Sequence, residues 1–231
     1  PAQLLAELFR EDNGTQTLAV YTDLEELIQD IAQAYRTVIR DLYDAGCRNI
    51  QFDDCTWGMF CDKNYWEARQ KDSVSLEEEA EKYLRLNNLA LENAPEDLVI
   101  TTHVCRGNYH STWASSGGYE PIAPFLFANE NVSAYYLEFD DERSGGFEPL
   151  RFVSDHKKVV LGLVTSKSPI LEEKEVIKKR IAKAAKYIPL NRLYLSPQCG
   201  FASCEIGNKL TEEEQWAKLA LVKEIAQEVW G

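Results

Sequence analysis

The sequence lacks several features that define large classes of protein. It contains no run of about 18 consecutive apolar residues, so no membrane-spanning helix is predicted, and no signal-peptide pattern opens it. Neither a G-x-G-x-x-G motif nor a P-loop is present, which argues against a nucleotide-binding sheet. Lys and Arg number 25 against 38 Asp and Glu, and the net charge is −13. Because nucleic acids and anionic membranes are bound by clustered basic residues, we expect neither as a partner.

Cysteine is present, but not in the pattern of a small secreted protein. The six cysteines have neither the dense regular spacing of a disulfide scaffold nor the C-x2-C knuckle of a structural zinc site. We therefore expect reduced thiols and a cytoplasmic location. Cys47, Cys55, Cys61 and Cys204 are interpreted as packing residues.

Helical and extended patterns alternate along the chain. The clearest helix is predicted over 23–45, with Thr22 and Glu25 as a capping box and Gly46 as the left-handed residue that ends it. Basic residues in 174–183 alternate with Glu and are interpreted as a solvated helix face. Further helices are predicted over 75–92, 121–128, 169–187 and 211–230, and strands over 48–54, 98–105, 133–140, 159–166 and 192–200. Ser75 with Glu78 and Thr211 with Glu214 are the predicted caps of the helices over 75–92 and 211–230.

The predicted strands are continuous apolar runs, which indicates a parallel sheet covered by helices. With 45% hydrophobic residues, no internal repeat and no Pro/Gly-rich linker, residues 1–231 are expected to form a single α/β domain. The pattern contains five βα units, whereas a closed barrel needs eight. Two alternatives follow: an open doubly wound sheet, or a barrel whose first three strands lie upstream of this chain.

Metal-ligand residue types stand at the ends of several predicted strands. His103 and Cys105 are two positions apart and should project from the same face of their strand. Glu138 and Cys199 follow two other strands, whose carboxyl ends meet at the same edge of a parallel sheet. Ligands so far apart in sequence are typical of a catalytic zinc site, although a core histidine, a core cysteine and a surface glutamate remain an open alternative.

Three further kinds of residue could contribute to a site at this edge. Asp53 could bind a cationic group such as a substrate amine or could cap a loop, while Asp54 should point the opposite way. Lys167 follows another strand and could be a proton donor, an anion clamp or a surface residue. Loop aromatics could stack on a ligand or pack the loops down, namely Trp57, Trp113 and Tyr119.

The segments IQFDD, THVC, YLEFD and SPQCG, in this order and spacing, resemble the C-terminal catalytic domain of cobalamin-independent methionine synthase. They resemble most the short bacterial relatives known as methionine synthase II-like proteins. The resemblance implies a TIM barrel of the uroporphyrinogen decarboxylase and methionine synthase superfamily. It also implies that Asp53 binds the homocysteine amine. The zinc ligands that it implies are His103, Cys105, Glu138 and Cys199.

The resemblance further implies that the chain covers about the last five βα units of the barrel, with other homocysteine contacts upstream. Two departures from the family pattern are visible. Lys167 stands where methionine synthases carry a histidine proposed as proton donor, and the stretch CTWGMFCD lacks the Glu-Pro that the family uses near the folate.

The expected function is zinc-dependent transfer of a methyl group to homocysteine, as in 5-methyltetrahydropteroyltriglutamate-homocysteine methyltransferase, with Lys167 as the catalytic acid. One alternative is a zinc thiol alkyltransferase that uses a methylcorrinoid donor or another thiol acceptor. A second alternative, of a different class, is a zinc- or thiol-binding barrel without turnover. The sequence leaves the methyl donor and the oligomeric state open.

Overall fold

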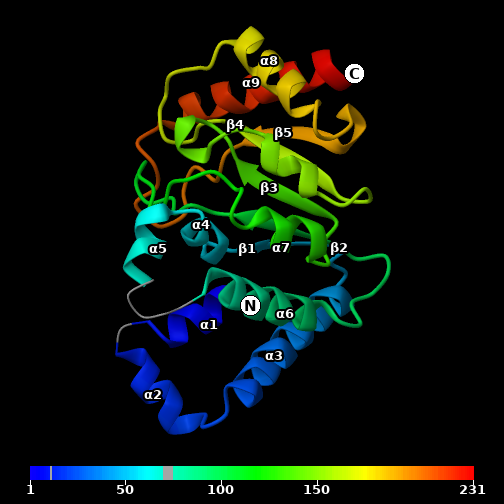
Figure 1. The fold of residues 1–231 in the computed structure, drawn as a ribbon. Helices are drawn as coiled ribbons and strands as arrows, with labels where there is room; N and C mark the ends of the chain where they lie inside the picture. The colour runs from blue at the N-terminus through cyan, green and yellow to red at the C-terminus, as the bar shows by residue number, and fades with distance from the viewer. Residues whose placement is uncertain (11, 70–74) are drawn as a thin grey trace.

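The expected strands form one parallel sheet in the computed structural model, which describes residues 1–10, 12–69 and 75–231 (Figure 1). Within these residues the sheet has five strands in the order β1-β2-β3-β4-β5, so each strand lies beside the next one along the chain. An open doubly wound sheet reverses its strand order at a switch point, and no such reversal occurs here. The strands are β1 (Asn49–Asp53), β2 (Val99–Val104), β3 (Ala134–Glu138), β4 (Lys158–Val164) and β5 (Leu193–Pro197).

Helices separate successive strands and pack along the sheet. Figure 1 shows α3 and α6 at the β1 side of the sheet and α8 and α9 at the β5 side. The α-helices are α1 (Ala2–Leu8), α2 (Asn13–Val20), α3 (Leu24–Asp44), α4 (Thr56–Phe60), α5 (Lys63–Arg69), α6 (Leu76–Leu91), α7 (Ala123–Asn129), α8 (Lys174–Ala184) and α9 (Glu212–Trp230). Short 3-10 helices are η2 (Glu142–Ser144), η3 (Glu148–Phe152) and η4 (Leu190–Arg192). No helix among the described residues combines the length and the apolar character that crossing a bilayer requires.

The predicted helix caps are largely confirmed. Ser75 accepts a hydrogen bond from the third residue of α6, and Thr211 forms a reciprocal capping box at α9. Gly46 follows the C-cap of α3 with φ of +101°, as its predicted role requires. The predicted cap at Thr22 is wrong. The first helical residue is Leu24, so the N-cap falls on Asp23, whose carboxylate accepts from the backbone N–H of Glu25.

Helix α8 begins at Lys174, five residues after the predicted start. Glu172 turns its carboxylate inward instead of starting a helix. One oxygen accepts the Thr165 N–H at 2.8 Å and also pairs with the buried Lys218 of α9 at 2.9 Å. These long-range bonds hold 170–173 outside a helix and connect the end of β4 to α9.

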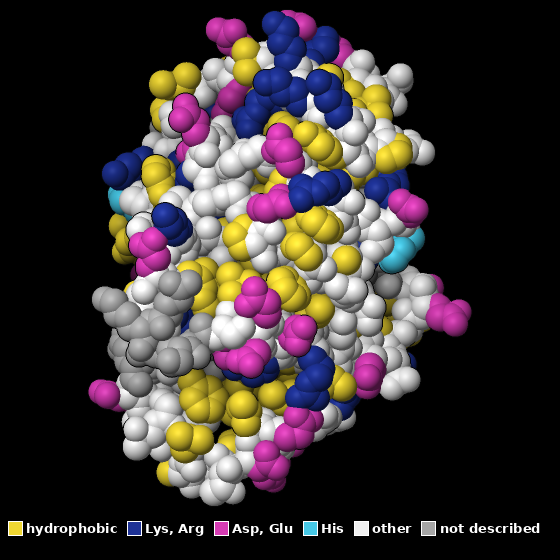
Figure 2. All heavy atoms as spheres, viewed as in Figure 1, with side chains coloured by type: hydrophobic (Ala, Val, Ile, Leu, Met, Phe, Trp, Pro, Cys, Tyr) yellow, Lys and Arg dark blue, Asp and Glu magenta, His cyan; other side chains and the backbone are white. Residues whose placement is uncertain are grey.

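Two lysines of the basic run in α8 pair with acids of the neighbouring helix α9. Lys174 contacts Glu224 and Glu228 of α9 at 2.7 Å each, and Lys178 contacts Glu228 at 3.0 Å. Figure 2 shows Lys and Arg side chains mixed with Asp and Glu at the upper end of the molecule, where Figure 1 places these two helices. Exposed pairs of this kind stabilise a fold only slightly, and the face is solvated surface, as predicted.

The carboxyl group of Glu130 is buried beside Asp54, the residue that follows β1, and the Asn87 amide donates to both. Glu130 is 2% exposed, and its Oε1 accepts from Asn87 Nδ2 at 2.8 Å. Its Oε2 has no hydrogen-bond partner among the described residues. Burial raises the pKa of Glu130 to about 8, and the nearby Asp54 adds to that rise while Asn87 opposes it.

We expect the Glu130→Gln variant to be more stable than the wild type at alkaline pH. The folded-state pKa of Glu130 lies above its unfolded value, so stability from this group is greatest at low pH and is lost as pH rises towards about 8. Each pKa unit corresponds to about 1.4 kcal/mol, so the gain at pH 9 should be on the order of several kcal/mol. Urea unfolding of both proteins at pH 5 and pH 9 measures it. The exposed Glu120→Gln serves as control, and parallel pH profiles for wild type and Glu130→Gln would contradict the assignment.

Candidate metal centre

The structure brings together the four residues that the sequence marks as metal ligands. His103 lies on β2, Cys105 follows its last residue, Glu138 ends β3, and Cys199 lies two residues beyond β5. One ligand atom from each of them lies within 4.8 Å of the ligand atoms of the other three. His103, Cys105 and Glu138 are buried, and Cys199 is half-buried. Imidazole, carboxylate and two thiols form a ligand set that suits a tetrahedral zinc ion.

His103 is oriented as a metal ligand. Its Nδ1 lies 3.1 Å from the carbonyl oxygen of Tyr136, which assigns the proton to Nδ1 because a carbonyl can only accept. Its Nε2 is buried and has no hydrogen-bond partner among the described residues. A buried nitrogen lone pair without a donor costs free energy unless an electrophile such as a metal ion occupies the position. The ligand residues therefore fit a zinc ion.

Glu138 is held at the strand end by backbone and side-chain hydrogen bonds. The Arg106 N–H donates to its Oε1 at 2.8 Å, and His103 Nε2 lies 3.7 Å from the same oxygen. The Tyr119 hydroxyl accepts from the Glu138 N–H at 3.0 Å and donates to its carbonyl oxygen at 3.2 Å. A carboxylate with no exposed surface is thus fixed in direction before any metal binds.

Arg143, from the loop after β3, neutralises this carboxylate. Its Nη2 donates to Glu138 Oε2 at 2.9 Å and to Asp140 Oδ1 at 2.8 Å, and its Nη1 pairs with Asp141. The guanidinium carbon lies 4.9 Å from the centre of the Trp113 ring, a cation–π contact. The Arg143 side chain is only 6% exposed, so these interactions operate with little screening by water.

Cys199 reaches the centre because β4 and β5 approach closely at Gly162. A Cβ atom at this position would lie 2.7 Å from the Cα of Gln198 and 2.8 Å from the carbonyl oxygen of Leu137, so only glycine fits. Gln198 is then fixed by Ser166, whose N–H and hydroxyl both donate to its Oε1 at 2.8 and 2.7 Å. The residue after it, Cys199, is thereby placed beside the other ligands.

The ionisable groups of the centre shift one another's pKa values. The pKa of Cys199 is raised by a hydrogen bond with Cys105 and by burial. The hydrogen bond with Cys199 lowers the pKa of Cys105, but a hydrogen bond with Cys55 and burial outweigh it and raise that pKa. Burial opposes protonation of His103, but Cys199, Glu138 and Asp53 outweigh it and raise its pKa. A bound dication reverses this balance, because a coordinating thiol is deprotonated.

Asp53 lies beside the four ligands. It ends β1 and pairs with His103 across the parallel ladder. The residue is exposed on the edge strand, but its carboxyl faces the cluster, where burial raises its pKa. Asp54 points away as expected: it is 3% exposed and accepts from the Thr56 N–H and from Asn87.

Lys167 lies three residues beyond β4 and near the cluster. Its Nζ donates to Asn108 Oδ1 at 2.8 Å. Burial lowers the pKa of Lys167, and the neighbouring Glu138 and Cys199 counteract that effect. A half-buried ammonium with a lowered pKa releases its proton more readily than a surface lysine does.

The loop aromatics divide into packing residues and one exposed residue. Trp57 and Tyr119 are completely buried, so they do not offer a face to a ligand, and the stacking alternative for them is wrong. Tyr119 instead donates a hydrogen bond to the Glu138 carbonyl oxygen, and the guanidinium carbon of Arg106 lies 4.3 Å from the centre of the Tyr119 ring. Trp113 is 51% exposed and contacts Arg143.

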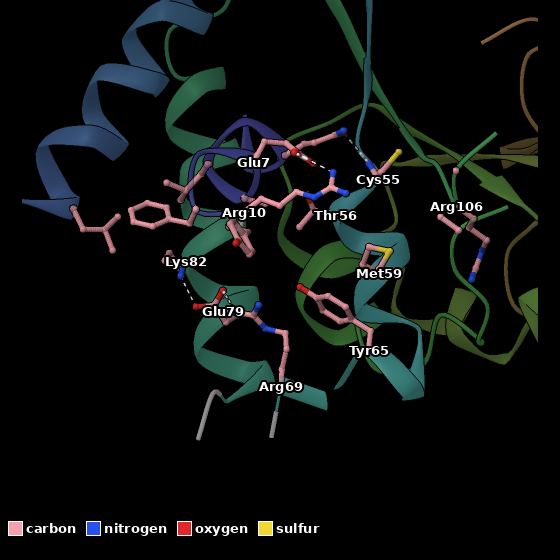
Figure 3. Close-up of a pocket in the computed structure, with 18 residues that line it drawn as sticks. Glu7, Arg10, Cys55, Thr56, Met59, Tyr65, Arg69, Glu79, Lys82 and Arg106 are labelled. Atoms are coloured by element: carbon pink, nitrogen blue, oxygen red, sulfur yellow. Dashed lines mark hydrogen bonds and ion pairs between the residues drawn. The ribbon is translucent and has the colours of Figure 1, made fainter. Parts of the chain in front are cut away.

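A pocket of about 740 Å³ adjoins the centre at Cys55. Figure 3 shows Glu79 and Lys82 of α6 on one wall, facing Met59 and Tyr65 of α4 and α5 on the other. Among the described lining residues, four are cationic and two acidic: Arg10, Arg69, Lys82 and Arg106, and Glu7 and Glu79. Glu7 pairs with Arg10, and Glu79 pairs with Arg69 and Lys82, so the charges of the lining largely compensate one another and leave a small cationic excess.

The sequence analysis did not identify two residues of this region, Arg143 and Cys55, as part of the site. Arg143 stands in a glycine-containing loop without any periodic signal, and its five-residue distance from Glu138 suggests no contact. Cys55 follows the two aspartates, and the alternation D-x-C beside H-x-C could have indicated it. Its side chain lies within reach of Cys105 and Asp53, which the interpretation as a packing residue did not anticipate.

Comparisons with known proteins agree with this geometry. Residues 18–228 match the family described as the catalytic domain of cobalamin-independent synthase. The uncharacterized protein YxjH of Bacillus subtilis is 48% identical over 212 residues, which cover 91% of this chain and 56% of YxjH. A methionine synthase of Pyrococcus horikoshii is 26% identical over 180 residues, covering 78% of this chain and 44% of that protein.

A solved structure extends the comparison to the fold. The crystal structure of a protein from Listeria monocytogenes, provisionally named a vitamin-B12-independent methionine synthase, matches with a TM-score of 0.73 and 40% identity. The match covers 91% of this chain and 57% of that one, so the chain spans about half the length of its relatives. The five-stranded sheet is accordingly part of a TIM barrel. The strand order, the ligand residues at the strand ends and the match over 18–228 together make the chain a member of the cobalamin-independent methionine synthase family, within its catalytic domain.

Proposed function

We propose that the chain carries the thiol-activating centre of a zinc-dependent methyltransferase that converts homocysteine to methionine. The observation that carries this proposal is the buried group of His103, Cys105, Glu138 and Cys199, in which His103 Nε2 has no hydrogen-bond partner among the described residues. When bound, zinc would lower the pKa of the substrate thiol, so that a thiolate is available at neutral pH. The reduced thiols of the centre suit a cytoplasmic setting.

The residues around the centre would position the amino acid and balance its charge. Asp53, which pairs with His103 in the sheet, would accept hydrogen bonds from the substrate ammonium group. Arg143 would retain Glu138 in place as an additional sulfur enters a site that already contains two thiolates. The substrate would thus be held by charge at one end and by its sulfur at the other.

The methyl donor would occupy the adjoining pocket. Its excess of cationic side chains supports an anionic donor such as methyltetrahydrofolate, whose glutamate carboxylates are negatively charged. The sulfur lone pair forms the new S–C bond while the bond between the methyl carbon and the donor nitrogen breaks. The ammonium group of Lys167 would protonate that nitrogen, in the place of the histidine of related sequences.

A second candidate is a thiol methyltransferase that uses another donor. The lysine at position 167 and the absence of Glu-Pro after Asp53 favour it, because both departures fall on the donor side of the site. A corrinoid leaving group needs no protonation at nitrogen, so Lys167 would then be dispensable.

The proposal is tested by metal analysis followed by a donor comparison. We expect the reduced chain to bind zinc stoichiometrically and to form methionine from homocysteine and methyltetrahydrofolate, measured by mass spectrometry. Product from methylcobalamin and not from the folate would favour the second candidate. A folded, zinc-loaded chain that methylates homocysteine with neither donor would contradict turnover by this chain.

A further inference from the structure

The ends of β1 and β2 carry a second group of metal-ligand residues beside the first. Asp53 and Cys55 are two positions apart at the end of β1, as His103 and Cys105 are at the end of β2. A carboxylate oxygen of Asp53 and the Sγ atoms of Cys55 and Cys105 all lie within 4.8 Å of one another. Cys105 therefore belongs to both groups.

Backbone pairing accounts for this arrangement. Asp53 pairs with His103, and the ladder continues past the strand ends, because the Asp54 N–H donates to the His103 carbonyl at 2.9 Å and the Cys105 N–H to the Asp54 carbonyl at 3.3 Å. These two bonds hold residues 53–55 alongside residues 103–105. Cys55 is the N-cap of α4, where the chain turns out of the strand direction (φ −77°, ψ −16°), and its Sγ still lies within 4.8 Å of the ligand atoms of Asp53 and Cys105.

We propose that Asp53, Cys55 and Cys105 form a second zinc subsite that shares the Cys105 thiolate with the first. A thiolate sulfur has more than one free lone pair and can bridge two ions. Three protein ligands leave one tetrahedral position for water, as in accessible zinc sites. Cys55 is half-buried and lines the pocket, so a second ion can enter from that side.

Charge favours a second dication at this position. Two thiolates and the Glu138 carboxylate already exceed the charge of one zinc ion. Asp53 and a Cys55 thiolate would add two further negative charges. The groups that act on Asp53 are His103, Asp54 and Cys105, and no Lys or Arg is among them within the described residues. Arg143 compensates the opposite side of the cluster, at Glu138.

The effect of the subsite on catalysis follows only if the proposed function holds. Asp53 cannot hold the ammonium group of an amino acid while it coordinates a metal ion. A second zinc ion would therefore compete with homocysteine, and excess zinc would inhibit the enzyme. Cys55→Ser should relieve this inhibition, because it removes a ligand of the second ion and no ligand of the first.

The test counts zinc ions on the intact, reduced chain without any substrate. Native mass spectrometry is performed over a zinc titration of wild type, Cys55→Ser and Cys47→Ser, with intact mass used to exclude a Cys55–Cys105 disulfide. We expect a second, weaker equivalent in wild type and in Cys47→Ser, and its loss in Cys55→Ser with the first equivalent retained. Circular dichroism verifies that each variant is folded, and Cys55→Ala repeats the test with a residue that cannot coordinate.

Two results would overturn the subsite: a wild type that takes up only one ion at excess zinc, or a second equivalent that persists in Cys55→Ser. Neither depends on turnover, so failure of the subsite is distinguishable from failure of the methyltransferase proposal. Where methylation is detectable, inhibition by excess zinc in wild type and its loss in Cys55→Ser complete the support. Equal inhibition of both proteins would assign the zinc effect to another position.

Discussion

Replacing Cys199 with Ser is expected to abolish tight zinc binding at the four-residue centre and, with it, methylation of the substrate thiol. Cys199 provides one of two thiol ligands, and serine does not deprotonate to offer an equivalent anionic ligand at neutral pH. The remaining His103, Cys105 and Glu138 would bind zinc far more weakly. Metal content after dialysis against a weak chelator, measured by atomic emission together with product formation, gives both readouts.

Cys204→Ser is the matched control for this variant. It removes another half-buried thiol in the same loop that does not belong to the ligand group. We expect zinc content and activity to remain at the wild-type level. If Cys199→Ser itself kept stoichiometric zinc and full activity, the assignment of the centre would be wrong.

Replacing Arg143 with Leu is expected to have the second-largest effect. The change leaves Glu138 and Asp140, with side chains 0% and 1% exposed, without their charge partner. Breaking a buried ion pair by removing one partner typically costs about 3–5 kcal/mol of stability. Loss of a group that orients a metal ligand typically lowers metal affinity by about 10- to 100-fold. Competition with a chromophoric chelator measures affinity, and urea unfolding measures stability.

Two further variants separate orientation of Glu138 from general loss of charge. Arg143→Lys keeps the charge but not the planar fork, so its zinc affinity should lie between those of wild type and Arg143→Leu. Arg151→Leu removes an arginine that is 45% exposed and pairs with the exposed Glu120, and we expect a change below about 1 kcal/mol. A folded Arg143→Leu protein that binds zinc as tightly as wild type would show that Glu138 needs no such support.

Local chemistry in the sequence was sufficient to predict the class of fold and to select four candidate ligand residues that the structure brings together. The helix cap at Ser75, the capping box at Thr211 and the apolar runs depend on neighbouring residues, and all were placed correctly. The H-x-C pair shares one face of a strand because side chains alternate along it, whatever the rest of the fold does. Parallel strands then bring their carboxyl ends, and therefore Glu138 and Cys199, to the same edge.

The supporting interactions depended on approaches between segments that no local pattern encodes. Glu172 lies outside the predicted helix because its carboxylate binds the Thr165 N–H and Lys218, which is 46 residues away in sequence. The sequence by itself determined which atoms can bind a metal, because that is a property of residue type and strand period. Only the tertiary structure decided what surrounds them: the loop that brings Arg143 to Glu138, and the close ladder that sets Cys55 beside Cys105. Those contacts follow from long-range packing. Its free energy is distributed over many residues, so no sequence spacing predicts them.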